Sequence, residues 1–100
     1  MMYEVMILLD PKLTDLQRKE EMDGIASAIE QHQGKVLKLV DQGRRKLAYP
    51  VKKSYEGYSL LYYVEGLGDM VKNLSRLFKI KEQILRFMIS QSEDVLEKTS

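Results

Sequence analysis

This chain has few of the cysteine and histidine side chains that proteins use for catalysis, disulfide formation and metal binding. It contains no cysteine, which excludes disulfides, thiolate metal sites and cysteine nucleophiles together. Its single histidine, His32, lies between two glutamines, and we expect it to be a solvated surface residue. No carboxylate, serine or cysteine stands around it at a recognisable spacing, so a general acid–base site tuned near neutral pH has no candidate residues. We therefore expect no catalytic residue, no metal site and no cofactor.

The chain also lacks a long apolar run. No segment approaches the roughly 18 apolar residues needed to span a membrane, and the first residues lack the basic segment and cleavage site of a secretory signal. Hydrophobic residues make up 44% of the 100 positions and charged residues 31%, which are ordinary values for a folded domain. We expect a cytoplasmic protein with no membrane partner and no small-molecule substrate. A single domain should span residues 1–90, followed by a mobile polar tail over residues 91–100.

Charge is balanced in total but not along the chain. The net charge is only +1, yet residues 35–53 carry seven cations against one anion, and residues 72–86 carry five against one. The segments around them are net acidic. Two basic segments in such a chain suit a protein with one phosphate-facing side. The alternative is that both segments are solvated faces.

Hydrophobic periodicity predicts six elements. Alternation of apolar and polar residues indicates strands, and apolar residues every three or four positions indicate helices. The first helix begins with a capping box, Thr14 followed by Gln17, and stops at Gly34. The expected strands span residues 3–9, 35–51 (interrupted near 41–43), 58–65 and 84–89, with a connection over 52–57 and a turn over 66–69 into the second helix.

The resulting order, β-α-β-β-α-β, is the split βαβ motif. Right-handed crossovers place the first and third strands at the centre of a four-stranded antiparallel sheet, with both helices on one face. The second and fourth strands then become the edges. We therefore expect an α+β protein with a ferredoxin-like fold.

The two faces of this sheet should differ in composition. The helix-covered face is expected to take the more apolar set of each strand, namely Tyr3, Val5, Ile7, Leu9, Tyr58, Leu60, Tyr62, Val64, Leu85, Phe87 and Ile89. The open face keeps Met6, Leu8, Leu61, Tyr63 and Met88, with Glu4, Glu65 and Arg86 at its rim. An apolar open face points to a partner, which makes Leu61, Tyr63 and Met88 candidate partner-binding residues. Scattered surface hydrophobic residues are the ordinary alternative.

Basic residues on the second helix are candidate phosphate ligands. Lys72, Arg76 and Lys79 recur at helical spacing on the side opposite the apolar stripe. Lys81 and Arg86 continue the charge into the following loop and the last strand. All five are therefore predicted to bind RNA.

Base stacking on the third strand is a weaker possibility. Open-faced βαββαβ modules read single-stranded RNA with strand aromatics, and residues 56–63 share their glycine and two of their aromatic positions. However, Glu56 stands where a cation is needed, and Leu60 stands where the second stacking ring is needed. We expect the aromatic residues of this strand to belong to the core.

The most distinctive segment spans residues 44–58. Arg44, Arg45 and Lys46 precede an apolar strand with Tyr49-Pro50 near its end. Proline is tolerated in a strand mainly at an edge, and an edge can accept a partner. The pattern predicts a long basic β-hairpin, with the three cations for RNA and Tyr49 as an anchor for a partner protein.

The chain resembles, from end to end, the bacterial small-subunit (30S) ribosomal protein family numbered six. The resemblance covers roughly residues 2–90 and is carried by residues 2–11, Gly34, residues 43–51, Gly57-Tyr58 and residues 84–89. Its specific part is the Arg-Lys-Leu-Ala-Tyr-Pro sequence of residues 45–50.

This resemblance implies the same β-α-β-β-α-β fold and a noncatalytic structural role. It implies binding to the central domain of small-subunit ribosomal RNA, as a heterodimer with the small-subunit protein numbered eighteen. It carries over to Arg45, Lys46 and Tyr49 of the hairpin and to Arg86 of the last strand. The other basic residues are inferred from the placement of charge.

A near-neutral chain with two basic segments should bind RNA weakly alone, because affinity rises with the number of phosphates neutralised. A basic partner would supply the missing charge, so the two proteins should bind as one unit. The competing hypothesis is a stand-alone protein-interaction or ligand-sensing module of the same fold, which would ignore RNA.

Overall fold

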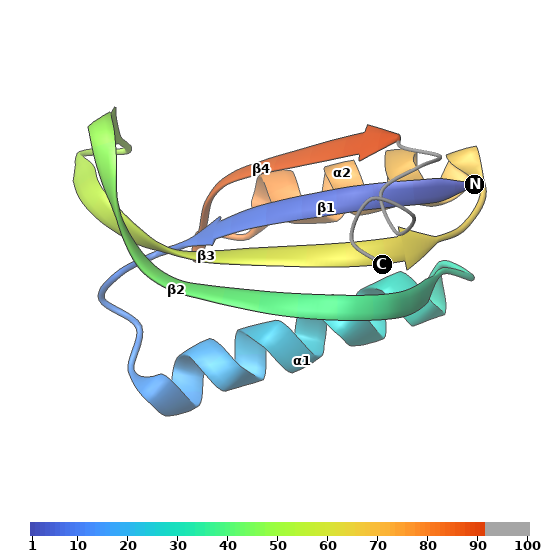
Figure 1. Cartoon of the computed structure of the whole chain (residues 1–100), viewed down its shortest axis with the longest axis horizontal. Coiled ribbons are helices and arrows are strands. Elements are labelled where there is room, and N and C mark those ends of the chain that lie inside the picture. The colour runs from blue at the N-terminus through green and yellow to red at the C-terminus, as the bar shows by residue number, and fades with distance from the viewer. Residues whose placement is uncertain (92–100) are drawn as a thin grey trace.

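The computed structural model describes residues 1–91 of the chain. The chain forms six elements in the order β-α-β-β-α-β, and Figure 1 shows their arrangement. They are β1 (Met2–Leu9), α1 (Asp15–Gln31), β2 (Lys35–Val51), β3 (Ser54–Glu65), α2 (Gly68–Ile80) and β4 (Ile84–Gln91). The number, order and type of these elements agree with the prediction. Apart from Gln91, which ends β4, the predicted tail lies outside the described residues.

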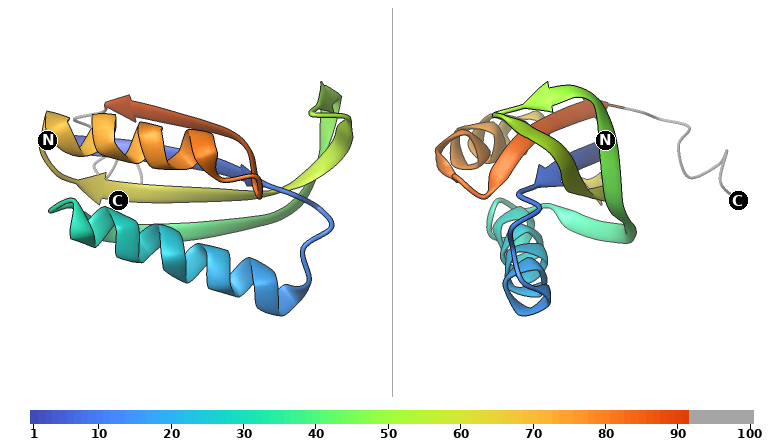
Figure 2. Two further views of the ribbon diagram at one scale, coloured as in Figure 1. Left: turned by 180° about the vertical axis from the view of Figure 1, so that it is seen from behind. Right: turned by 90° about the vertical axis from the view of Figure 1, so that its left-hand side faces the viewer.

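The four strands form one antiparallel sheet in the order β2-β3-β1-β4. The central positions of β1 and β3 and the edge positions of β2 and β4 are as predicted. Both helices cover the same face of the sheet, as Figure 2 shows from behind and from one end. Within residues 1–91, no helix covers the opposite face. This is the ferredoxin-like split βαβ fold, and it leaves one face of the sheet open.

The core lies between the sheet and the two helices. Its buried members are Tyr3, Val5, Ile7, Leu9, Ile25, Ala28, Ile29, Leu60, Tyr62, Val64, Met70, Leu74, Phe78 and Ile84. Tyr62 is wholly buried, and its hydroxyl donates to the Met22 carbonyl oxygen at 2.9 Å. Burial, assisted by the nearby negative charge of Asp23, raises the pKa of the Tyr62 phenol. The inward residues of β1 and β3 thus follow the predicted alternation, with Tyr58 only partly buried.

Helix α1 begins where the capping box predicts and ends at Gln31, just before the predicted stop, but the left-handed conformation after its C-cap belongs to Gln33 (φ 66°) rather than to Gly34. The Thr14 hydroxyl accepts a hydrogen bond from the Gln17 backbone N–H at 3.1 Å, and the Gln17 side chain accepts one from the Thr14 N–H at 2.9 Å. Past the other end, a Cβ on Gly34 would lie 2.4 Å from the Met70 sulfur and 2.7 Å from Ile29 Cγ2. Gly34 is therefore required where the end of α1 approaches α2.

The turn between β2 and β3 is tighter than predicted. β3 begins at Ser54 rather than at Tyr58, and the two residues Lys52-Lys53 replace the predicted connection over residues 52–57. Both lysines have positive φ, 48° and 66°, as a two-residue type I′ turn requires. Such turns usually contain glycine or asparagine, which makes them recognisable in a sequence. The lysines give no such signal, which is why the predicted loop is too long.

A β-bulge changes the register of β4. Leu8 of β1 pairs with Arg86, whereas Leu9 pairs with Ile84, so one extra residue lies on β4. Strict alternation, counted back from the middle of the strand, predicts that Leu85 points inward, and the bulge adds Ile84 to the core cluster. Leu85 is also buried. Arg86 precedes this shift in the ladder and lies on the open face opposite Leu8, as alternation from Met88 predicts.

Candidate partner-protein and nucleic-acid interface

The hairpin arm, defined as residues 44–58, extends beyond the rest of the sheet. Its two strands pair with each other, but the pairing of β3 with β1 stops at Tyr58. The arm follows a β-bulge at Gly43, whose φ is 73°. This bulge accounts for the interruption predicted near residues 41–43. The register of β2 against β3 also shifts between Val36 and Lys38 and, within the arm, between Lys46 and Val51. Bulges bend strands, and Figure 1 shows the green arm curling up toward the level of β4.

Two contacts fix this curl. At the tip of the arm, Lys52 Nζ donates to the Ile84 carbonyl oxygen at 3.3 Å. Near its base, Gly57 lies directly against β1, where a Cβ would meet Leu8 Cδ1 at 2.6 Å and the Leu9 carbonyl oxygen at 3.1 Å. Because only glycine permits this approach, Gly57 determines how closely the arm folds over the sheet.

The space between the arm and the open face is a largely apolar groove of about 300 Å³. This open-face groove is lined by Met6, Leu8, Arg45, Leu47, Ser59, Arg86, Phe87 and Met88. A hollow of about 240 Å³ continues it along the arm and is lined by Leu8, Lys46, Leu47, Ala48, Tyr49, Val51 and Arg86. Apolar side chains with cations beside them can hold an apolar protein segment next to an anion.

Two of the four predicted partner-binding residues lie in this groove or its continuation. Met88 lines the groove with 50% of its surface exposed, and Tyr49 lines the continuation with 64% exposed. The Tyr49 ring is therefore available to a partner rather than used in the core of the free protein.

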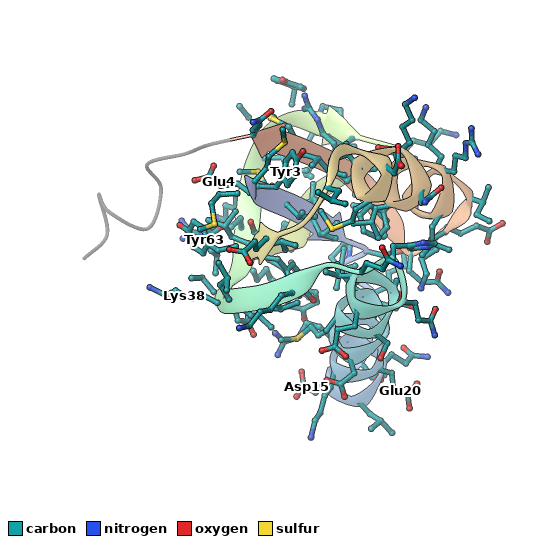
Figure 3. All side chains as sticks on the ribbon, turned by 90° about the vertical axis from the view of Figure 1, so that its right-hand side faces the viewer. Tyr3, Glu4, Asp15, Glu20, Lys38 and Tyr63 are labelled. Carbon is teal, nitrogen blue, oxygen red and sulfur yellow. The ribbon has the colours of Figure 1, made fainter. Side chains whose placement is uncertain are left out.

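The other two predicted partner-binding residues lie further along the open face, on β3. Figure 3 shows Tyr63 with Glu4 and Lys38 on the side of the sheet away from the helices. Tyr63 stands between these two residues in the strand register, and Lys38 Nζ lies 6.0 Å from its ring centroid. Only 8% of Tyr63 is exposed, whereas Leu61 is half-buried. Tyr63 therefore offers a partner much less surface than its place on the open face suggests.

Three of the predicted RNA-binding residues surround the groove. Arg45 and Arg86 line it, and Lys46 lines its continuation. All three are exposed, and none forms a salt bridge within residues 1–91. Arg45 Nε donates to the Gln42 carbonyl oxygen at 3.2 Å, which orients its guanidinium. These three cations are free to bind phosphate.

Arg44, in contrast, is bound within the protein. Its guanidinium forms a salt bridge with Glu56 at 2.6 Å and donates to the Pro11 carbonyl oxygen at 3.0 Å and the Tyr58 hydroxyl at 3.2 Å. The hydrogen bonds to Tyr58 and Glu56 raise the pKa of the Arg44 guanidinium. The guanidinium carbons of Arg44 and Arg18 lie 5.2 and 4.8 Å from the Tyr58 ring centroid. Arg44 thus ties the arm to the loop before α1, and its charge is already compensated.

The remaining predicted RNA-binding residues lie in the helix layer. Lys72, Arg76 and Lys79 are exposed on α2. Lys81 follows α2, and its Nζ lies 3.0 Å from Glu21 Oε2 of α1 in a half-buried salt bridge. The groove is on the other face of the sheet. The eight predicted RNA-binding residues therefore form two separate groups rather than one continuous site.

Sequence reasoning missed three residues that line the groove, namely Leu47, Ser59 and Phe87, of which Phe87 was expected on the helix-covered face. Leu47 lines both the open-face groove and its continuation. Alternation gives no clear signal for it, because Lys46 and Ala48, of the opposite parity, also line the continuation and the register shifts between Lys46 and Val51. Alternation predicts Met6 and Leu8 on the open face, and both line the groove.

Within residues 1–91, no helix has both the length and the apolar character needed to cross a membrane. In the same residues, no three His, Cys, Asp or Glu side chains gather into a group that could hold a metal ion.

The family model for ribosomal protein S6 matches residues 2–91 of the chain. This chain belongs to the ribosomal protein S6 family. The small ribosomal subunit protein bS6 of Thermus thermophilus is 38% identical to it over 92 residues, which cover 92% of this chain and 91% of that protein. The bS6 protein of Caldanaerobacter subterraneus is 33% identical over 92 residues, covering 92% and 97% of the two chains.

A solved structure shows the same arrangement. The crystal structure of 30S ribosomal protein S6 from Thermotoga maritima matches with a TM-score of 0.90 at 26% identity, covering 98% of this chain and 92% of that one. The predicted family and fold are thereby confirmed. As an S6-family protein the chain is a structural constituent of the small ribosomal subunit and so of the cytoplasmic ribosome, and RNA binding and a role in translation fit this family. The relatives carry the names of ribosomal proteins rather than of enzymes.

Proposed function

We propose that this chain joins the small ribosomal subunit, in a noncatalytic role, by binding the central domain of its ribosomal RNA together with the small-subunit protein numbered eighteen. The observation that supports this proposal best is the open-face groove, an apolar space of about 300 Å³ beneath a basic arm. A groove of this composition offers a protein partner an apolar surface and offers RNA the cations around it.

The partner's side of the proposal rests on exposed apolar surface. Met6, Tyr49 and Met88 expose 42%, 64% and 50% of their surfaces around the groove and its continuation. Clustered exposed apolar residues mark interaction sites on soluble proteins. An apolar segment of the partner would lie between Leu8 on the sheet and Leu47 on the arm, which both line the groove.

The RNA's side of the proposal rests on uncompensated charge. Arg45, Lys46 and Arg86 could each neutralise one phosphate, and the whole chain has a net charge of only +1. Because affinity depends on how many phosphates are neutralised, so few contacts favour weak binding by the chain alone. A partner seated in the groove would bring its own cations next to these three. The joint complex would then bind RNA more tightly than either protein does.

Filter binding to a central-domain RNA fragment tests this proposal. We expect little retention with this chain alone and strong retention with both proteins. Met88→Asp should abolish the gain from the partner, because it places a carboxylate in the apolar groove. Leu16→Asp is the matched control, since Leu16 is 67% exposed on α1 and lines neither the groove nor its continuation.

Equal retention by this chain alone would contradict joint binding. In cells, the protein should sediment with small subunits in high magnesium and leave them in high salt. A protein that stays in the soluble fraction under both conditions would favour the stand-alone interaction or ligand-sensing module instead.

A further inference from the structure

We propose a second RNA site on the hairpin arm, a basic hollow in which a single-stranded RNA base stacks on Tyr55 while Lys12, Lys46 and Lys53 hold the neighbouring phosphates. This arm hollow has a volume of about 540 Å³ and is lined by Pro11, Lys12, Lys46, Leu47, Lys53, Ser54, Tyr55 and Glu56. The inference rests on the RNA-binding role proposed above. It goes beyond that role by naming a separate binding location, a single-stranded RNA as the ligand and Tyr55 as the ring on which a base stacks.

The lysines of the arm hollow converge from three different parts of the chain. Lys12 comes from the loop before α1, Lys46 from β2 and Lys53 from the turn at the tip of the arm. All three are exposed, and none forms a salt bridge within residues 1–91. The one carboxylate of the hollow belongs to Glu56, which lies 2.6 Å from the Arg44 guanidinium and is neutralised by it. The hollow therefore presents three positive charges to an anion.

The backbone holds these lysines in place. Lys46 pairs with Glu56 in the strand register, and Lys53 has a fixed left-handed conformation with φ of 66°. The Lys12 N–H donates to Asp10 Oδ1 at 2.9 Å, which orders the loop before α1. Little backbone entropy should be lost when a phosphate binds, because these three positions are already ordered.

The ring of Tyr55 favours RNA over an acidic protein segment. It exposes 66% of its surface on β3, beside the lysines, at a position where the register between β2 and β3 is irregular. Cations that follow a phosphate backbone, combined with aromatic rings for successive bases, are the usual composition of sites for single-stranded nucleic acids. An acidic peptide would use the lysines but would leave the flat ring without a matching group. Duplex RNA keeps its bases stacked inside the helix and could not use the ring either.

The arm hollow adjoins the proposed partner site. Lys46 and Leu47 line both the hollow and the continuation of the open-face groove. RNA in the hollow and a protein segment in the groove would therefore lie next to each other across the arm. This adjacency gives a direct physical reason for the two ligands to bind jointly.

The test uses the full chain without its partner and a short fluorescein-labelled oligoadenylate, followed by fluorescence anisotropy at low salt. Tyr55→Ala should weaken binding roughly 5- to 150-fold, whereas Tyr55→Phe should bind like the wild type. K12Q/K53Q should flatten the log–log salt dependence by about 1.4, because each phosphate contact on a single strand contributes about 0.7. K19Q/K35Q is the matched control, since both lysines are exposed and lie outside the hollow.

Any one of three results would contradict the proposed RNA site in the arm hollow. Tyr55→Ala could bind as well as the wild type, the two double-lysine variants could give the same salt slope, or polyglutamate or a duplex of the same length could displace the oligoadenylate as well as the single strand does. All of the changed side chains are exposed, so equal melting temperatures should show that the variants are folded. Assembly of the wild type with its partner on the central-domain RNA is scored separately. If the wild type assembles but Tyr55→Ala binds oligoadenylate as well as the wild type does, only the arm-hollow proposal is refuted. If Tyr55→Ala weakens oligoadenylate binding but the wild type does not assemble with its partner, only the joint-binding proposal is refuted.

Discussion

Truncating Tyr49 should loosen the complex with the partner protein without loosening the fold. The residue exposes 64% of its surface, and a tyrosine buries roughly 200 Å² when fully covered, so a partner could cover about 130 Å² more. At about 25 cal/mol per Å², this burial contributes about 3 kcal/mol, and ordering the side chain costs about 1 kcal/mol. We therefore expect Tyr49→Ala to weaken the heterodimer by about 2 kcal/mol, or about 30-fold in Kd.

Calorimetric titration with the partner, run beside thermal melts of the free variants, measures both quantities. The melting curve of Tyr49→Ala should stay close to that of the wild type, because exposed substitutions usually change stability by less than about 0.5 kcal/mol. Tyr55→Ala is a close control, since Tyr55 is 66% exposed on the same arm but does not line the groove or its continuation. In the absence of RNA it should bind the partner like the wild type.

The reasoning fails if the two tyrosine variants lose the same partner affinity, because the effect would then belong to the arm in general. It also fails if Tyr49→Ala melts well below the wild type yet binds the partner at full strength. In that case the ring would serve the fold, and the partner surface would lie elsewhere.

Three further predictions follow from the fold and its charges. Gly57→Ala should destabilise the protein by about 1–3 kcal/mol in urea unfolding, because the new Cβ clashes with β1. Gly24→Ala is the control: its Cβ meets nothing within 4 Å, and it should stabilise α1 by about 1 kcal/mol. Equal changes in the free energy of unfolding would refute this account of the arm. K72Q/K79Q should lower the salt slope of RNA assembly by about one per lost phosphate contact with little change in melting temperature, and an unchanged slope would mean a solvated helix face. Tyrosine ionises in the unfolded chain above pH about 10, whereas buried Tyr62 keeps its proton in the native state, so stability should fall as the pH rises. Y62F should show a smaller fall. Parallel profiles of stability against pH for the two proteins would contradict this role of Tyr62.

Most of the fold could be predicted because its signals are local. Val5 and Ile7 alternate with more exposed neighbours over a half-buried strand, and period two is what such a strand imposes. The Thr14 capping box depends only on residues within one helical turn. In contrast, the turn at Lys52-Lys53 depends on positive φ at lysines, which composition does not reveal.

The site was harder to predict because neighbouring residues with the same chemistry have different roles. Arg44 and Arg45 are adjacent, yet Arg44 is paired within the chain and Arg45 lines the groove. The difference comes from the cross-strand register, which places Arg44 opposite Tyr58 and near Glu56. A β-bulge at the start of the arm sets this register, and a bulge is invisible to a pattern of hydrophobic and charged residues.

The position of β1 at the centre of the sheet has a consequence during synthesis. β1 leaves the ribosome first, but it pairs with β3 and β4, and β4 ends only at Gln91. At synthesis rates of about 5–20 residues per second, the apolar β1 must wait several seconds for its second neighbour. Arg86 and Met88 on that last strand also line the groove. An unfinished chain therefore cannot display a complete groove, so truncated products would not compete with finished ones for the partner.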